Sequence, residues 1–245
     1  PCYYITLAGS GEPTLHACLE ELIRKIKEMT GIPIAVITNG SLLYLPEVRE
    51  SLMRADLVVP SLDAGDAVLF EYVNRPHPDI IFERMAEGLV EFGRRYEGCL
   101  WLEVLLVSGV TGLASEAKKI AAWAKKINAG KIQLGTVNRP ACEDFACAVD
   151  ARQMKTLVGL FPGEVDMLEN DRPADLAPTG PTDTTDSDIL SLLARRPCTL
   201  EGLCSGLGLK PQDAVKRIER LIALGRASTK RNGRTVFYIQ AERGV

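Results

Sequence analysis

The sequence predicts an α/β protein built on a parallel sheet, followed by a small C-terminal domain of different character. Over roughly the first 170 residues, short runs rich in Val, Ile and Leu alternate with longer segments of helical periodicity, which is typical of parallel βαβ units. Polar residues gather at the C-terminal ends of the strand-like runs, where parallel α/β folds bind ligands. The composition, 46% hydrophobic and 25% charged over 245 residues, suits a globular protein of this kind.

The βαβ pattern supplies five clear strands, a weaker sixth and three long helices. The predicted strands are Tyr3–Leu7, Pro33–Thr38, Leu57–Leu62, Leu100–Val107, Lys131–Thr136 and Glu164–Leu168. The predicted helices are Thr14–Met29, Ile80–Tyr96 and Ser115–Asn128, each with apolar residues on one face. Six strands are too few for a closed eight-stranded barrel, so an open or partial barrel is expected.

The C-terminal part has its own pattern. A Pro-, Thr- and Asp-rich stretch, 173–187, is predicted to be a linker, and residues 188–241 a winged helix-turn-helix domain. Three short helices are expected at Asp188–Arg195, Leu200–Leu207 and Pro211–Leu224, and Asn232-Gly233 is a strong hairpin signal. From Asp183 onward the chain has 11 Lys/Arg against 7 Asp/Glu, whereas the preceding part has 18 against 25.

This basic tail makes nucleic acid, tRNA or DNA, a candidate partner. The cations expected to make that contact are Lys216, Arg217, Arg220, Arg231 and Arg234. Winged helices are also common protein–protein modules, and Lys/Arg faces are often merely solvated, so both interpretations stay open.

The most informative local pattern is Gly9-Ser10-Gly11-Glu12-Pro13, directly behind the first strand. The glycines leave backbone groups open to a ligand, and Glu12 offers a negative charge that suits an ammonium group. Pro13 then starts a helix where its missing N–H costs nothing. The alternative is an ordinary strand-to-helix turn with a carboxylate in the first turn.

These residues resemble the radical S-adenosylmethionine (radical SAM) superfamily. Ile5–Leu15 is similar to the motif of the family's second strand, and the segments Ile37–Gly40, Val59–Asp63 and Val73–Pro78 match the strands and loops that follow. The resemblance covers roughly residues 1–170 and is nearest to the Fe–S oxidoreductase branch related to tRNA wyosine-synthesis enzymes. It implies a partial (β/α)6 TIM-like barrel over residues 1–172 that lacks its first βα unit.

The resemblance also implies a cofactor site and a reaction. Gly9, Ser10, Gly11 and Glu12 would hold the amino group of S-adenosylmethionine (SAM). Ser61 and Asp63 would face its ribose or carboxylate, Asn39 would line the same opening, and Arg139 is a candidate for a substrate anion. In the family a reduced [4Fe–4S] cluster cleaves SAM to a 5′-deoxyadenosyl radical, with a reductant protein as partner. The substrate is unknown, and the related branch makes RNA modification one option.

One departure from the family is serious. The family's Cys-x3-Cys-x2-Cys motif, which holds the cluster, does not occur in these 245 residues: Cys142 and Cys147 are five apart, and Cys198 and Cys204 six apart, without a third partner nearby. The chain is therefore expected to be an N-terminally truncated enzyme, inactive alone and without metal ligands of its own.

Two rival functions remain: a ligand-sensing or nucleic-acid-binding regulator, and a non-radical α/β enzyme that shares the glycines by chance. Glu103 would point into the barrel if its strand alternates with the core, either as a functional group or as a satisfied buried carboxylate. Seven cysteines without framework spacing, and no secretory signal, favour the cytoplasm. The free cysteines, Cys18, Cys99, Cys198 and Cys204 among them, are expected to be buried.

Overall fold

The computed structural model describes residues 3–9, 11–138, 143, 145–168, 184–233 and 235–241. The chain divides into two compact units. The first, here called the barrel unit, comprises the described residues of 3–137 and 145–168. The second, the tail unit, has its helices and strands within residues 184–241. Each is described by itself.

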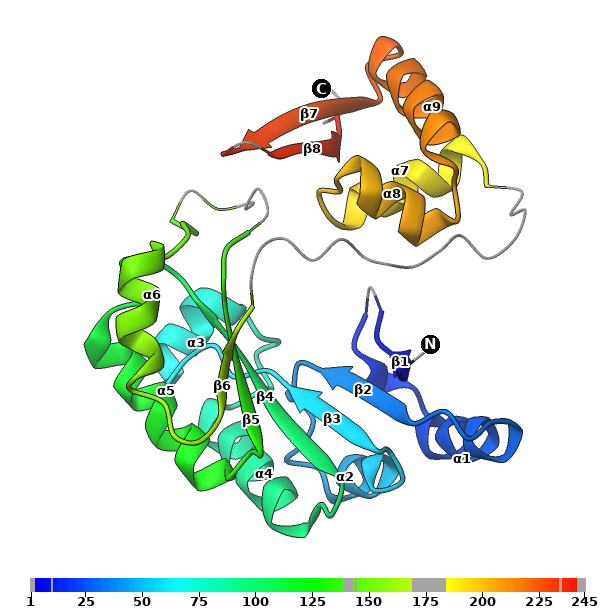
Figure 1. Ribbon diagram of the computed structural model, residues 1–245. Helices are drawn as coiled ribbons and strands as arrows, with labels where there is room; N and C mark the ends of the chain where they lie inside the picture. The colour runs from blue at the N-terminus through cyan, green and yellow to red at the C-terminus, as the bar shows by residue number, and fades with distance from the viewer. Residues whose placement is uncertain are drawn as a thin grey trace. The chain divides into compact units, whose positions relative to one another are not determined.

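The barrel unit contains a six-stranded, wholly parallel sheet whose strands follow one another in sequence order (Figure 1). The strands are β1 (Ile5–Leu7), β2 (Ile34–Thr38), β3 (Leu57–Pro60), β4 (Cys99–Leu106), β5 (Lys131–Thr136) and β6 (Val165–Met167). Neighbouring strands that are parallel and sequential require a crossover between each pair, which the helices provide. The predicted α/β class and the parallel sheet are confirmed, and the open sheet is consistent with a partial TIM-like barrel.

Helices cover one face of this sheet (Figure 1). They are the 3-10 turn η1 (Pro13–Leu15) and the helices α1 (Leu19–Met29), α2 (Pro46–Leu52), α3 (Ala67–Asn74), α4 (Phe82–Arg95), α5 (Ala114–Ile127) and α6 (Ala151–Val158). Alternation along β4 shows how the faces divide: Leu102 and Val104 are fully buried in the core that the helices share. Trp101 instead joins a small cluster of strand residues with Leu57 and Val59 on the other face, here called the inner face.

The predicted helix from Thr14 is interrupted. Pro13–Leu15 forms one 3-10 turn, and α1 begins only at Leu19. The 3-10 turn ends at His16, which is extended and whose backbone N–H donates to the carbonyl of Pro13 at 3.0 Å. The helices α2, α3 and α6 were not among the expected elements, and each has only seven or eight residues.

The expectation that the cysteines are buried is correct only in part. Cys198 is buried in the tail unit, and Cys204 is half-buried. Cys18, Cys99 and Cys147 are exposed. Cys18 is exposed because it precedes the first turn of α1, and Cys99 because it opens β4 at the end of the strand where the core stops.

The tail unit has three helices and an antiparallel pair of strands: α7 (Asp186–Arg195), α8 (Leu200–Leu207), α9 (Pro211–Ala223), β7 (Ala227–Asn232) and β8 (Thr235–Gln240). The helix α7 begins two residues before the predicted Asp188, because Thr185 and Asp188 form a reciprocal capping box. The strands pair from Asn232 opposite Thr235, so Asn232 belongs to β7 and not to the turn as predicted, and Gly233 takes the positive φ.

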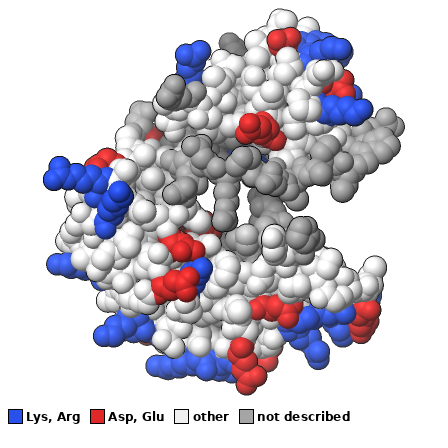
Figure 2. All heavy atoms as spheres, viewed as in Figure 1, with Lys and Arg blue, Asp and Glu red and all other residues white. Residues whose placement is uncertain are grey.

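Charges on the barrel unit are mixed. Basic and acidic side chains both appear over the face of the barrel unit seen in Figure 2. The ion pairs of this unit include Arg24–Glu28, Lys25–Glu21 and Arg95–Glu50. No helix in the described part of the chain is both long and apolar enough to cross a membrane.

Candidate functional site

The loop after β1 leaves its backbone open. Gly9 and Gly11 are both exposed, and a Cβ added to Gly11 would meet nothing within 4 Å. Packing therefore does not require glycine at position 11, and the open backbone is available to a ligand. Ser10, assigned to the same loop by the resemblance, lies outside the described residues.

Glu12 joins the loops that follow β1 and β2. Its Oε1 accepts hydrogen bonds from the backbone N and the Oγ1 of Thr14, at 3.0 and 2.7 Å, and from Thr38 Oγ1 at 2.5 Å. Its Oε2 accepts from the Asn39 backbone N at 2.7 Å. The carboxylate thus caps η1 and fixes the end of β2. Among the described residues, Oε2 accepts one hydrogen bond, so it keeps an acceptor position for an ammonium group.

Asn39 and Gly40 form the turn that ends β2. Asn39 Oδ1 accepts from the Ser41 backbone N at 2.9 Å, and its side chain is exposed at the edge of the sheet. Gly40 has a φ of 72°, and a Cβ there would lie 3.3 Å from Leu89 Cδ2. Asn39 and Gly40 thus form a turn whose first backbone N–H is held by the Glu12 carboxylate.

Ser61 and Asp63 follow β3, which ends at Pro60, two residues earlier than predicted. Ser61 N donates to the Thr38 carbonyl at 3.1 Å, which brings the ends of β2 and β3 together. Asp63 Oδ1 accepts from Leu105 N at 2.9 Å, and its Oδ2 accepts from Asn74 Nδ2 at 2.8 Å. Burial raises the pKa of Asp63, although these two hydrogen bonds act in the opposite direction.

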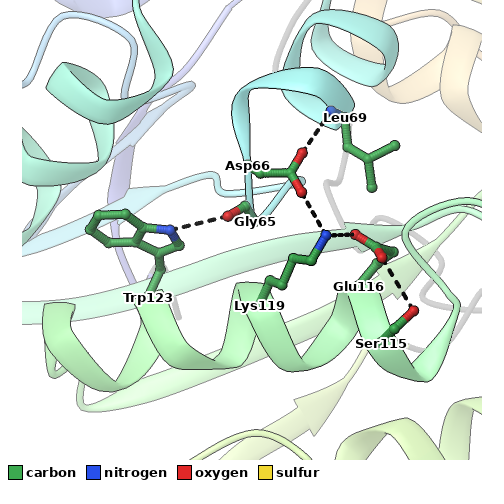
Figure 3. A network of polar contacts seen from close by, with 7 residues as sticks. All are labelled: Gly65, Asp66, Leu69, Ser115, Glu116, Lys119 and Trp123. Carbon is green, nitrogen blue, oxygen red and sulfur yellow. Dashed lines mark hydrogen bonds and ion pairs between the residues drawn. The ribbon is translucent and has the colours of Figure 1, made fainter.

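The loop behind Asp63 is clamped to α5 (Figure 3). Lys119 Nζ donates to Asp66 Oδ2 at 2.7 Å and to Glu116 Oε2 at 2.8 Å, and Trp123 Nε1 donates to the Gly65 carbonyl at 3.2 Å. Asp66 also caps α3 through Leu69 N. These contacts hold the backbone that carries Asp63, so they position one wall of the candidate site.

A row of polar side chains crosses the inner face at this end of the sheet. Ser61 pairs with Glu103, Glu103 with Gln133, and Gln133 with Asp166. We call these four residues the polar row. Sequence reasoning left the role of Glu103 open and did not include Gln133 or Asp166; the only signal for Glu103 was the strand alternation.

The described residues fit SAM better than they fit its partner cluster. The glycine loop, Glu12, Asn39, Ser61 and Asp63 all lie at the carboxyl edge of β1–β3, and Glu12 retains an acceptor. In contrast, no three His, Cys, Asp or Glu side chains of the described part are placed to hold a metal ion. Cys142 and Arg139 lie outside the described residues. An iron–sulfur cluster is therefore not matched by the ligands described.

The predicted nucleic-acid contacts of the tail unit have different surroundings. Arg217 Nη1 donates to the Thr184 carbonyl, and Arg220 pairs with Asp186 at 2.8 Å, so both arginines hold the start of α7 to α9. Lys216 and Arg231 are exposed, and Arg234 lies outside the described residues. Arg217 is half-buried, and Arg220 is exposed but paired with Asp186, so Lys216 and Arg231 are better placed for a partner.

The chain is similar in sequence to several bacterial and archaeal proteins. It is 36% identical over 225 residues to a protein named GTPase Obg from Brachyspira hyodysenteriae, which covers 91% of this chain and 33% of that protein. It is 34% identical over 239 residues to a UPF0026 protein of Helicobacter pylori strain J99, with 97% and 75% covered. A UPF0026 protein of Methanocaldococcus jannaschii is 32% identical over 142 residues, with 58% and 44% covered.

These lengths limit what can be transferred. The chain spans only a third of the Brachyspira protein, and it contains no Gly-x4-Gly-Lys-Ser/Thr phosphate loop that would account for a GTPase. No protein-family model matches the chain.

Two solved structures share the fold of the barrel unit. One is a domain of a pyruvate-formate lyase-activating enzyme from Bacteroides vulgatus, with a TM-score of 0.55 and 18% identity over 67% of this chain and 98% of that one. The other is a radical SAM methyltransferase from Sphaerobacter thermophilus, with a TM-score of 0.53 and 17% identity over 67% and 51%. The barrel unit therefore has the fold of radical SAM enzymes. With a UPF0026 protein matched over three quarters of its own length, the chain belongs to the UPF0026 family.

Proposed function

We propose that this chain is the SAM-binding part of a radical SAM enzyme. The observation that carries the proposal is the Glu12 carboxylate, which ties the open glycine loop after β1 to Thr38 and Asn39 at the end of β2. The carboxyl edge of a parallel sheet is where α/β folds bind ligands. The likeness of the barrel unit to two radical SAM structures supports the same conclusion.

In this proposal different residues contact different parts of SAM. Glu12 Oε2 and the backbone of Gly9 and Gly11 receive the ammonium group of SAM, with Asn39 beside them. Ser61 and Asp63 face its ribose or carboxylate. SAM supplies the radical chemistry only when it is reductively cleaved at a cluster. We assign no cluster ligand to the described residues and propose that a Cys-x3-Cys-x2-Cys segment outside these 245 residues provides them.

Calorimetric titration of the 245-residue chain with SAM tests the binding part of the proposal. We expect saturable binding that Glu12→Gln weakens at least about tenfold, because a lost charge-assisted hydrogen bond costs about 1.5–3 kcal/mol. Asp63→Asn should weaken it as well. Glu83→Gln, an exposed carboxyl in the first turn of α4, is the matched control and should bind like the parent chain. Equal affinity of Glu12→Gln and the parent would contradict the assignment.

The complete reading frame tests the radical part. Anaerobic reconstitution with iron and sulfide should give broad visible absorbance, and reduction should release methionine from SAM. The proposal includes a reductant protein as electron donor, oxidoreductase-type chemistry and a cytoplasmic location. A colourless complete protein that still binds SAM would instead favour the ligand-sensing regulator.

For the tail unit we propose a winged-helix domain that contacts nucleic acid, which would present an RNA substrate to the barrel unit. Support comes from its three helices and antiparallel strand pair, and from the exposed Lys216 and Arg231. Mobility shifts with tRNA and duplex DNA at two salt concentrations test it: binding should weaken with salt and with Lys216→Gln. Lys118→Gln on α5 is the control. Absence of salt-dependent binding to either would leave protein contact as the role of this unit.

A further inference from the structure

Glu103 occupies an unusual place in the sheet. It lies in the middle of β4, between Leu102 and Val104, which are fully buried against the helices. Alternation therefore directs its side chain to the inner face, which the helices of the barrel unit leave uncovered. The neighbouring positions of the polar row, Ser61 on β3 and Gln133 on β5, lie on either side of it.

The Glu103 carboxylate has no hydrogen bond or ion pair with any residue that the structure describes. Two other carboxylates of the same unit do have hydrogen-bond donors: Glu12 accepts four hydrogen bonds and Asp63 accepts two. Glu103 is half-buried, and this burial raises its pKa, as does the nearby charge of Asp63. The Glu103 carboxylate is thus half-buried on the inner face, and its oxygens are available to a ligand.

The charges around Glu103 favour a positive ligand. Asp63 is on the β3 side. On the β5 side lies Lys131, two residues before Gln133, and its Nζ is already paired with Glu164 at 2.6 Å and Asp166 at 2.9 Å. Lys131 also lies over the Trp101 ring, 5.1 Å from its centroid. Within the described part of the chain, no cation therefore pairs with Glu103, while Ser61 and Gln133 offer oxygens for further N–H groups.

We infer that Glu103 binds a cationic group, an amine or a guanidinium, of the molecule on which the enzyme acts. This inference rests on the proposed function and extends it to the class of substrate. In that proposal SAM occupies Glu12 and Asn39 at the strand ends and extends to Ser61 and Asp63, the neighbours of Glu103, whereas Glu103 itself is assigned no contact with SAM. Two different probes therefore test the two assignments: SAM for the first and a small ammonium ion for the second.

The test uses n-butylammonium as the probe and n-butanol as its neutral isostere. The pH titration of 13C-labelled glutamate carboxyls, with the Glu103 signal identified by its loss in Glu103→Gln, reports the pKa directly. Butylammonium should lower the pKa of Glu103 by about 1, because a nearby opposite charge favours the ionised form. Butanol should leave it unchanged, and the probe should leave the glutamates of the exposed helical faces unchanged too.

Thermal unfolding supplies the second readout. Butylammonium should raise the melting temperature of the parent chain and of the Glu83→Gln control, and not that of Glu103→Gln. SAM affinity should be the same in all three proteins. An equal response of Glu103→Gln to the probe overturns the inference, and so does loss of SAM binding in that variant. Failure of the parent chain to bind SAM would overturn the proposed function while leaving the ammonium result readable.

Discussion

Asp63 and Asp66 lie three positions apart in the loop after β3, yet their pKa values are shifted in opposite directions. Burial raises the pKa of Asp63 above 3.8. The hydrogen bond from Lys119 lowers the pKa of Asp66, with help from the Leu69 backbone N–H and the charge of Lys119. The ionised carboxylate of Asp63 therefore destabilises the folded state, whereas that of Asp66 stabilises it.

This contrast predicts opposite pH dependences for two isosteric variants. The stability that Asp66 provides is present above pH 3.8 and is lost as the pH falls through its lowered pKa, so the penalty of Asp66→Asn should grow between about pH 3 and 6. The contribution of Asp63 is present below pH 3.8 and is lost as the pH rises through its raised pKa. The penalty of Asp63→Asn should therefore shrink over the same range.

Urea unfolding of the ligand-free chain at several pH values measures both penalties. The control is Glu83→Gln, whose difference from the parent should stay flat. Parallel curves for the two aspartate variants would show that their surroundings do not differ as described.

At the scale of elements, the loop after β3 approaches α5 unusually closely. A Cβ on Gly65 would lie 2.3 Å from Lys119 Cβ and 2.8 Å from the Ile120 backbone N. Backbone atoms of a helix cannot move aside singly, so the whole loop would have to shift. The hydrogen bond from Trp123 to the Gly65 carbonyl would then be lost as well.

Gly65→Ala should lower the free energy of unfolding by about 1–3 kcal/mol, the usual cost of overpacking. It should also weaken SAM binding, because Asp63 is carried by the same loop. Gly11→Ala provides the matched contrast: nothing lies within 4 Å of its added Cβ, so stability should change by less than about 1 kcal/mol. Chemical denaturation of both variants measures the change in stability, and titration with SAM measures the change in affinity of Gly65→Ala. Equal destabilisation by the two substitutions would be inconsistent with the close approach.

At the scale of the whole molecule, the two units have separate cores. Most buried residues of the barrel unit form one large cluster, beside the small cluster on its inner face. The tail unit has a cluster of its own, which includes Ile189, Leu193, Leu203, Ile218 and Leu221. Separate cores allow separate unfolding transitions. Both tryptophans, Trp101 and Trp123, lie in the barrel unit, so their fluorescence reports on that unit alone.

Leu221→Ala should therefore destabilise the tail unit by about 2–5 kcal/mol, the range for truncating a buried leucine. Unfolding curves followed by far-UV circular dichroism should acquire an early transition, while the tryptophan fluorescence curve stays where it was. Leu102→Ala, in the barrel core, is the reciprocal control and should shift the fluorescence curve. A fluorescence shift in Leu221→Ala would mean that the two units unfold together.

Much of the fold was predictable because its signals are local. Buried parallel strands are continuous apolar runs, and the predicted and observed strands agree within about two residues at each end. The short helices α2, α3 and α6 were missed because two turns are too few to establish a period. Their starts were nevertheless marked, by Pro46 at the first position and by the capping residues Asp66 and Asp150.

The sequence predicted which strand ends carry the residues of the candidate site. It did not predict the hydrogen bonds that connect them. Nothing local in the sequence indicates that Thr38 donates to Glu12 across 26 positions, or that Asp63 is bonded to Leu105 across 42. Likewise the sequence predicts Arg217 and Arg220 to be available to nucleic acid, although each is hydrogen-bonded at the beginning of α7. Contacts between distant positions depend on the register of the sheet and the packing of helices, which a single sequence does not contain.

The hydrogen bonds that join Glu12 to Thr38 and Asn39 have a consequence for the local opening of β1. Among the described strands β1 is at an edge: it has three residues and one neighbour, and it is followed by the loop that Glu12 fastens to β2. Edge segments of this kind open locally far more often than the whole unit unfolds. A ligand that occupies Glu12 Oε2 and the glycine backbone binds only the closed form, so its occupancy and the fraying of the edge are thermodynamically linked. The protection of the Leu7 amide against hydrogen exchange would then rise with ligand concentration and serve as a measure of affinity.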